Sequence, residues 1–553
     1  MLSLLGFIFF CMLVLMNKYN YKSDVKLIVK HYDHSEFKAN KNLSFMKVGY
    51  FPNLTFINKA FYECKRLRRI ELGDIPKIDS IRYMSSCCNR LEYAEFGDMY
   101  NVNNICMLFE HCRRLTHLIL GNMPNIEYIG TLTAKCPIKH VYIGNMPKVT
   151  EMHATFRDCF TLLDASIGYT PELKYGRLMF CNCRKITHVD LSSAKYLEDA
   201  CNIFEGCERL MRFKLRTHSL KHANHMFKGC KSIPYINLGD QPELLSATSM
   251  FEGCKRLRRV KLSSVKSLGT ANSMFEGCER LTYIDLSSAE SLVITSKMFK
   301  GCKRLKRLNL KYQPNLSVGI KMFAGCERLT YVDLSLAGSL YSARGMFKGC
   351  EGLTRFKLGT SSVKYSDHMF KGCKRLEYVD LSSATSLFVA TGMFEGCERL
   401  TYVDLSSATY LYVATEMFKG CEGLIDFKLT TQSLQDIGRM FVGCKAIPSI
   451  NLGYQPNLCF ANECFKDCFN LRRVSINGIT RNIIGENMFA NCSSLREINL
   501  HGLNIIGKEA YEHCFNIDRE ETYTHCFNID HKDRSNKKIK MIKPIKWIRL
   551  TEK

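Results

Sequence analysis

A single phrase recurs through most of this chain and constrains its fold more than any other feature. It reads Met-Phe-x-Gly-Cys-x-x-Leu-x-x-Val-x-Leu, with Ile or Phe replacing the Val in some copies, and it returns every 23 or 24 residues. The clearest copies are Met274–Leu286, Met322–Leu334, Met393–Leu405 and Met417–Leu429. A fixed period of this length is typical of a solenoid, in which each unit contacts only its neighbours. The repeat therefore favours a surface that holds partners over a catalytic pocket.

The first part of each unit predicts one β-strand. In the unit Leu400–Cys421, Val403 and Leu405 alternate with Tyr402 and Asp404. This alternation predicts a strand with two inward and two outward side chains, followed by a turn at a Ser-Ser pair.

The second part of each unit predicts a short helical turn. Ala414–Phe418 suits one turn of helix with Met417 and Phe418 in the core, and Leu411 is a further inward anchor. Gly420 would end that helix, because glycine adopts the left-handed conformation without strain. A glycine precedes the repeat cysteine in eleven consecutive units. Residues that also tolerate positive φ replace it at Asp158, Asn182, Asp467 and Asn491.

These elements predict an α/β repeat solenoid with a parallel β-sheet on one face and short helical turns on the other. The frame holds roughly twenty units. It divides the chain into four parts. Residues 1–16 are a hydrophobic signal or anchor segment, and residues 17–39 are an N-terminal lead-in. Residues 40–515 are the repeat array, and residues 516–553 are a degenerate repeat with a basic tail.

Cysteines follow the same frame. Of the 28 in the chain, twenty occupy one position of the repeat, from Cys64 to Cys514. The most regular run is Cys254, Cys278, Cys302, Cys326, Cys350, Cys373, Cys397 and Cys421. A free cysteine behaves as a small buried hydrophobe, and stacked neighbours with parallel Cβ vectors are poorly placed for disulfides. We therefore expect this cysteine ladder to be reduced core structure.

The chain is strongly basic, with a formal net charge of +25. A charge of this size concerns partners and solubility more than fold. It fits a solvated basic surface, and it also fits attraction to acidic glycans, membrane surfaces or nucleic acid. The tail Lys532–Lys553 holds nine Lys or Arg against two acids, together with Trp547. Such a tail could contact an anionic surface, or it could be a terminal strand or a solvated end.

The start of the chain is apolar. Leu2–Met16 carries no charge and has the length of a secretory signal rather than a membrane span. No Lys or Arg precedes it, and no small-x-small cleavage site follows. In order of preference it is a secretory signal, an uncleaved anchor, or a buried N-terminal cap.

No motif for catalysis is present, and we expect no enzyme activity, no cofactor, no metal and no small-molecule substrate. The chain lacks a P-loop, a nucleophile elbow and the His-Glu-x-x-His pattern. His513-Cys514 recurs as His525-Cys526, which could bind a metal, but a tandem duplication of a decaying repeat explains it better. His117, His140 and His188 fall at outward strand positions without a carboxylate motif around them.

The repeat phrase resembles the BspA-type leucine-rich repeat, also called the treponemal type, whose units read Ala-Phe-x-x-Cys-x-x-Leu-x-x-Ile. The resemblance implies a leucine-rich-repeat horseshoe or arc. It also implies a surface or secreted protein of the kind associated with adhesion to host matrix or cells. This chain uses Met where Ala is usual, and its signal sequence is atypical.

Two outward columns are candidate partner-binding residues. The first contains Arg259, Tyr283, Arg307, Tyr331, Arg355, Tyr378 and Tyr402, and the second contains Lys261, Asp285, Asp333, Lys357, Asp380 and Asp404. Tyr and Arg are enriched at binding hot spots. The columns could equally pair with each other across strands and fix the register of the sheet.

Together these features predict a non-enzymatic binding protein, secreted or displayed at the cell surface, that takes part in adhesion or protein–protein interaction with a protein or extracellular-matrix ligand. The first alternative is a cytoplasmic scaffold. The second is an anionic-membrane or nucleic-acid binder that uses its basic surface and tail. We expect that changing Arg259, Arg307 and Arg355 to Ala abolishes partner binding and leaves the fold intact.

Overall fold

The computed structural model describes residues 25–31, 41–500 except 51, 56, 58, 311, 481 and 482, and 505–506. The chain forms two compact units, Met1–Leu268 and Gly269–Lys553, which we call unit 1 and unit 2. The apolar start, the two His-Cys pairs and the basic tail lie outside the described residues.

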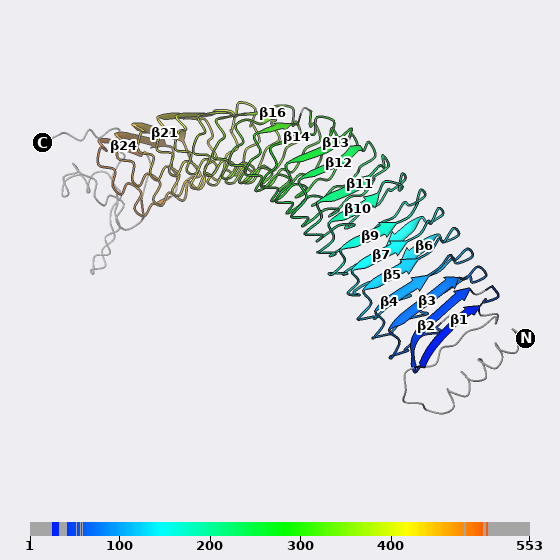
Figure 1. Cartoon of the computed structure of the whole chain (residues 1–553). Helices are drawn as coiled ribbons and strands as arrows, with labels where there is room; N and C mark the ends of the chain where they lie inside the picture. The colour runs from blue at the N-terminus through cyan, green and yellow to red at the C-terminus, as the bar shows by residue number, and fades with distance from the viewer. Residues whose placement is uncertain are drawn as a thin grey trace, which may run out of the picture. The chain divides into compact units, whose positions relative to one another are not determined.

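Each unit is a stack of coils in which strands pair in parallel (Figure 1). The strands of unit 1 are β1 Val25–His31, β2 Leu43–Tyr50, β3 Arg69–Asp74, β4 Tyr93–Phe96, β5 His117–Leu120, β6 Tyr128–Gly130, β7 His140–Ile143, β8 Glu151–His153, β9 Asp164–Ile167, β10 His188–Leu191, β11 Arg212–Leu215, β12 Tyr235–Asp240 and β13 Arg259–Ser263. Those of unit 2 are β14 Tyr283–Asp285, β15 Arg307–Asn309, β16 Asp333–Leu334, β17 Arg355–Leu358, β18 Tyr378–Asp380, β19 Tyr402–Leu405, β20 Asp426–Leu429, β21 Ser449–Tyr454, β22 Arg473–Asn477, β23 Ile483–Ile484, β24 Glu497–Leu500 and β25 Ile505–Ile506.

The main ladder of strands follows the repeat frame. Strand β19 pairs with β20 so that Tyr402 lies opposite Asp426, 24 residues later. Val403 and Leu405 are buried, while Tyr402 and Asp404 face outward. The parallel solenoid that the repeat predicts is therefore confirmed. We call the outward side of this ladder the strand face.

A second parallel ladder runs through each unit and was not predicted. It consists of single bridged residues, one per coil, such as Tyr365, Val389 and Val413. Among the described residues, this ladder is longer than one residue per coil only at the pairs β6–β8 and β23–β25. One bridged residue per coil leaves no alternating pattern in the sequence.

The predicted helical turns are wrong, because the described residues contain no helix. In Ala414–Cys421 the backbone N–H groups alternate between two kinds of acceptor. Those of residues 417, 419 and 421 donate to the carbonyl three residues back, as in consecutive β-turns. Those of residues 416, 418 and 420 donate to carbonyls of the next coil, over 2.9, 2.8 and 2.7 Å. A helix cannot form, because every second N–H bonds to the neighbouring coil. We call this side of the coil the turn side.

Two backbone positions on the turn side require positive φ. The first is the predicted one before the ladder cysteine, where Gly420 has φ 71° and Asn491 has φ 63°. The second lies four residues earlier, at Glu416 with φ 56°. In both cases the residue is the third of a β-turn, where type II geometry needs a left-handed backbone. The glycine thus serves a turn, not the end of a helix.

The core between the two sides contains columns of identical side chains. Phe299, Phe323 and Phe347 stack with 5.5 and 5.2 Å between ring centroids. The thiol of Cys350 is buried and donates to the carbonyl oxygen of Phe323 in the preceding coil, over 3.1 Å. The same contact recurs at Cys326, over 3.2 Å to Phe299. The ladder cysteines therefore act as hydrogen-bond donors as well as apolar filling.

In unit 1, strands β4, β5, β7 and β9 are each followed by a glycine that lies close to the backbone of the glycine in the preceding coil. A Cβ atom on Gly121 would lie 2.5 Å from the carbonyl carbon and oxygen of Gly97. The residues after these glycines form a ladder, in which Asp98 Oδ1 accepts the backbone N–H of Asn122 over 2.7 Å and Asn122 Oδ1 accepts that of Asn145 over 2.9 Å. The missing side chain lets the coils approach closely enough for this ladder.

Three buried glutamines show how coil length decides whether a buried amide is satisfied. Gln241 Nε2 donates to the carbonyls of Thr217 and Leu238 over 2.7 and 2.6 Å, and Gln455 repeats these contacts. Gln313 is only 2% exposed, yet both its amide atoms lack partners among the described residues. The segment before it, Leu286–Leu292, is one residue longer than Leu215–Leu220 before Gln241.

Replacing Gln313 by Met is expected to stabilise unit 2 by about 1–3 kcal/mol, because it removes an unsatisfied buried amide at nearly constant volume. The matched change Gln241→Met should instead destabilise unit 1 by about 1–3 kcal/mol, because it strands two buried carbonyls. Midpoints of urea unfolding would compare the variants with the parent protein. Equal effects of the two changes would contradict this account.

Candidate binding face

The predicted binding columns lie on the strand faces of both units. Arg259 and Lys261 lie on β13 of unit 1, opposite Tyr235 and Asn237 of β12. The other candidates lie in unit 2, on or directly before strands β14 to β19. Tyr283, Tyr331 and Tyr378 are 49%, 52% and 54% exposed, so about half of the surface of each of these residues is open to solvent.

The aspartates of the second column close the turn after their own strand. Asp404 Oδ1 accepts the backbone N–H of Ser406 over 2.9 Å and its hydroxyl over 2.6 Å, and Oδ2 accepts the Tyr402 hydroxyl over 3.4 Å. The bonds from Ser406 lower the pKa of the Asp404 carboxyl. Asp380 is bound in the same way by Ser382, which lowers its pKa too. The aspartates therefore have a structural role whether or not a partner is present.

Two lysines pair with these aspartates across strands: Lys357 of the second column, and Lys428, which lies opposite Asp404 on β20. Lys357 Nζ lies 3.7 Å from Asp380 Oδ2, and Lys428 Nζ lies 3.9 Å from Asp404 Oδ2. Exposed pairs of this kind contribute little to stability. Pairing across strands thus accounts for part of the second column.

Arginines of the first column are not used in this way. Arg259, Arg307 and Arg355 are exposed, and no described acid forms an ion pair with them. Arg355 lies opposite Tyr378 in the ladder. In the same column of unit 1, Arg69 lies 3.9 Å above the ring of Tyr93. The three Arg side chains therefore keep their charge available to a partner, whereas Tyr hydroxyls such as that of Tyr283 already donate to the Asp two residues on.

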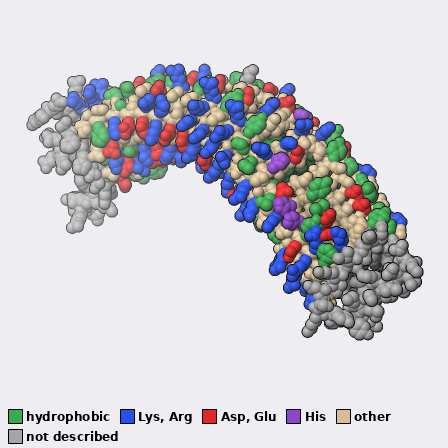
Figure 2. Space-filling model, viewed as in Figure 1, with side chains coloured by type: hydrophobic (Ala, Val, Ile, Leu, Met, Phe, Trp, Pro, Cys, Tyr) green, Lys and Arg blue, Asp and Glu red, His purple; other side chains and the backbone are tan. Residues whose placement is uncertain are grey.

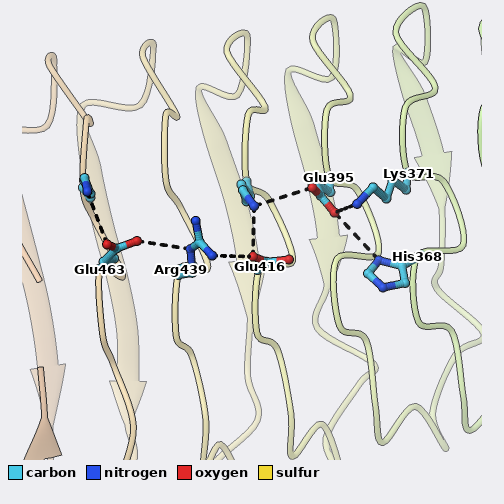
Figure 3. A network of polar contacts seen from close by, with 8 residues as sticks. His368, Lys371, Glu395, Glu416, Arg439 and Glu463 are labelled. Atoms are coloured by element: carbon cyan, nitrogen blue, oxygen red, sulfur yellow. Dashed lines mark hydrogen bonds and ion pairs between the residues drawn. The ribbon is translucent and has the colours of Figure 1, made fainter. Parts of the chain in front are cut away.

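On the turn side of unit 2, several charges between Lys371 and Glu463 instead form a network with one another. Figure 3 shows the network, in which Lys371 Nζ lies 2.6 Å from Glu395 Oε2. Arg439 joins two acids, with Nη1 3.2 Å from Glu416 Oε1 and Nε 3.1 Å from Glu463 Oε2. Lys419 joins Glu395 to Glu416, over 3.7 and 2.9 Å. Lys371, Glu395 and Lys419 occupy the variable position of Met-Phe-x-Gly-Cys in successive coils. Their alternating charge was the sequence signal that could have predicted this network.

Histidines gather on the strand face of unit 1. The rings of His117 and His140 stack with 5.0 Å between centroids, and His140 Nδ1 lies 2.5 Å from Asp164 Oδ1. Burial, followed by the neighbouring His140, lowers the pKa of His117. The sequence did not reveal the carboxylate partner, because Asp164 belongs to the next coil. His188 lies opposite Arg212.

The surface as a whole carries both signs of charge. Figure 2 shows Lys and Arg side chains over much of the visible surface, interspersed with Asp and Glu. Within the described ranges, no group of three or more His, Cys, Asp or Glu is arranged to hold a metal ion. No helix in this part of the chain has the length and apolarity needed to span a bilayer.

A family model described as the BspA type leucine rich repeat region matches residues 33–163, 152–257, 245–338, 343–442 and 412–538. This match confirms the resemblance that the repeat phrase indicated. No curated protein sequence matches the chain significantly.

Several solved structures are similar. A leucine-rich repeat protein from Bacteroides ovatus is 19% identical over 72% of this chain and 91% of its own, with a TM-score of 0.46. A leucine rich cell surface protein from Faecalibacterium prausnitzii is 18% identical over 64% and 83%, with a TM-score of 0.33. The pneumococcal vaccine antigen PcpA is 11% identical over 74% and 87%, with a TM-score of 0.31.

Proposed function

Because the chain belongs to the family of BspA-type leucine-rich-repeat proteins, we propose that it is a secreted or surface-displayed protein that binds a macromolecular partner through its strand face. The observation that carries the proposal is the row of exposed groups on the strand face of unit 2. On the turn side, several charges between Lys371 and Glu463 are bound to one another. On the strand face, exposed Tyr rings and unpaired Arg side chains alternate from coil to coil.

The face suits an extended or repetitive partner. Neighbouring parallel strands are about 4.8 Å apart, so the column offers equivalent groups at regular intervals. Tyr buries a large area with few rotatable bonds, and the planar guanidinium of Arg makes directional paired hydrogen bonds. Both residues are enriched at binding hot spots. An extracellular-matrix protein or another extended host molecule fits these properties.

Changing Arg307 and Arg355 together to Ala is expected to reduce partner binding by about thirtyfold or more, because a single hot-spot residue contributes about 2 kcal/mol or more. The measurement is retention of purified protein on surfaces coated with extracellular-matrix proteins. Lys297 and Lys321, exposed on the turn side of unit 2, give a matched control when both are changed to Ala. Loss of thermal stability in the Arg variant, or binding that is unaffected, would contradict the proposal.

Display at the surface has a separate test. If the array is displayed, a protease added to intact cells should cleave it. N-terminal sequencing of the mature protein then shows whether the apolar start has been removed. A protected array with residue 1 or 2 still at its start would reject display and favour the cytoplasmic scaffold.

A further inference from the structure

One coil of unit 2 is exceptionally basic. Between Cys302 and Gly325 the sequence contains no Asp or Glu. Lys303 lies 3.6 Å from Glu327 of the next coil. Arg304, Lys306 and Arg307 are exposed, and none of them forms an ion pair with a described acid. Three uncompensated cations thus lie within four consecutive residues, at the start of β15.

The two neighbouring coils extend this basic group. Arg280 and Arg328 occupy the same frame position as Arg304, one coil before and one coil after it, and no described acid pairs with either. Because adjacent strands are about 4.8 Å apart, the three guanidinium groups form a short row along the array. In the repeat frame the row lies between the ladder cysteines and the strand face, three residues before Tyr283, Arg307 and Tyr331.

Aromatic rings border the same cations. Tyr283 is the ladder partner of Arg307, and Tyr331 occupies the same column one coil later. The two tyrosines are 49% and 52% exposed. The two tyrosines are two coils apart, about 9–10 Å, which is close to the length of one disaccharide.

The remaining outward groups decide which polyanion fits. Asp285 lies opposite Asn309 on β15, and Asp333 follows in the next coil. Carboxylate and amide oxygens accept hydrogen bonds from hydroxyl groups, whereas carboxylates repel a backbone with a phosphate at every residue. A sugar polymer with many hydroxyls and intermittent anionic groups satisfies all of these side chains. Nucleic acid would meet Asp285 and Asp333 unfavourably.

We propose that Arg280, Tyr283, Arg304, Lys306, Arg307 and Tyr331 form a binding site for an acidic polysaccharide that carries sulfate or carboxylate groups. Arginine would bind these groups through paired hydrogen bonds, and the tyrosine rings would stack on sugar faces. The inference rests on the proposed function, because it names the partner class of the same strand face.

The test measures binding of a size-defined heparin fragment and of polygalacturonate at physiological salt, about 0.15 M, with dextran as the neutral comparison. The variant Arg304→Gln, Lys306→Gln, Arg307→Gln should lose at least about tenfold in affinity for one of the acidic polymers. Lys297→Gln, Lys321→Gln, Lys348→Gln removes the same charge from exposed turn-side positions and should change affinity less than about twofold. Tyr331→Leu should weaken binding, whereas Tyr331→Phe, which keeps the ring, should not.

Three outcomes would overturn the inference: no binding of either acidic polymer, equal losses in the two triple variants, or tighter binding of a single-stranded RNA oligomer with the same dependence on the strand-face residues. The proposed function is judged separately by matrix-protein retention. If Arg307 and Arg355 are needed there but no acidic polymer binds, the partner class is wrong and the function stands. If neither kind of partner binds, both fail.

Discussion

Substituting Gly121 by Ala is expected to destabilise unit 1 by about 3 kcal/mol or more, because the new methyl group overlaps backbone rather than a movable side chain. Its Cβ would lie 2.5 Å from the carbonyl carbon and oxygen of Gly97 and 2.7 Å from the backbone nitrogen of Asp98. Relief would require the coils to separate, which would also lengthen the Asp98–Asn122 contacts. The loss should appear as a lower midpoint in urea unfolding.

Gly253 offers a matched control in the same unit. It has φ +73°, but the atoms nearest to an added Cβ would be 3.8 Å away. Gly253→Asn should therefore cost less than about 1 kcal/mol, because Asn tolerates the left-handed conformation. Comparing the two variants distinguishes the loss of stability caused by lack of space from the loss caused by backbone conformation. A larger effect at Gly253 than at Gly121 would show that conformation, not coil spacing, limits this part of the fold.

Alkaline unfolding is the second large effect we expect. Burial raises the pKa of the ladder thiols, to about 12 for Cys64, Cys136 and Cys350. In the unfolded chain these thiols titrate near 8.5, so the unfolded state loses its protons first. Stability is then complete below about pH 8.5 and falls as pH rises toward 12, by about 1.4 kcal/mol per pH unit for each ladder thiol.

Several such thiols together exceed the about 5–15 kcal/mol that holds a typical domain folded. We therefore expect the protein to unfold near pH 10. Circular dichroism would report the loss of structure, and thiolate ultraviolet absorbance would report ionisation of the thiols. Thiolate from the buried ladder cysteines should appear with loss of structure and not before it, and only off-ladder cysteines such as the partly exposed Cys87 and Cys459 can ionise earlier. In a variant with Cys302, Cys326 and Cys350 changed to Ala, the denaturation midpoint should fall less steeply between pH 7 and pH 10. Most of the thiolate absorbance appearing while the dichroism is unchanged would refute this account.

The sequence predicted the strand side of the coil well, because that side repeats a pattern of period two. Tyr402–Leu405 was expected as a strand and is β19, with Val403 and Leu405 inward. The turn side was misjudged as helical. Glu416 gives no sign of a left-handed backbone, and bonds between coils cannot be read from the spacing of apolar residues within one coil.

The candidate site was predicted in part for the same reason. The repeat frame placed Arg307, Tyr331 and Asp404 on one outward surface. Only the structure assigns them different roles, because Asp404 is bound by Ser406 while Arg307 is left without an ion pair among the described residues. The sequence did contain a signal for this difference, since an Asp followed two residues later by Ser is a common turn-closing arrangement.

The alternating bonds of the turn side have an electrical consequence. In each coil the N–H groups of residues such as Phe418 and Gly420 point to the next coil, and the carbonyls that accept them point back. Each peptide group has a dipole of about 3.5 D, and aligned groups add. Within a unit these dipoles sum along the stacking direction, as they do along the axis of an α-helix. Partial positive charge therefore accumulates toward later coils and partial negative charge toward earlier ones, so each unit has an electrical polarity that no substitution of its side chains can remove.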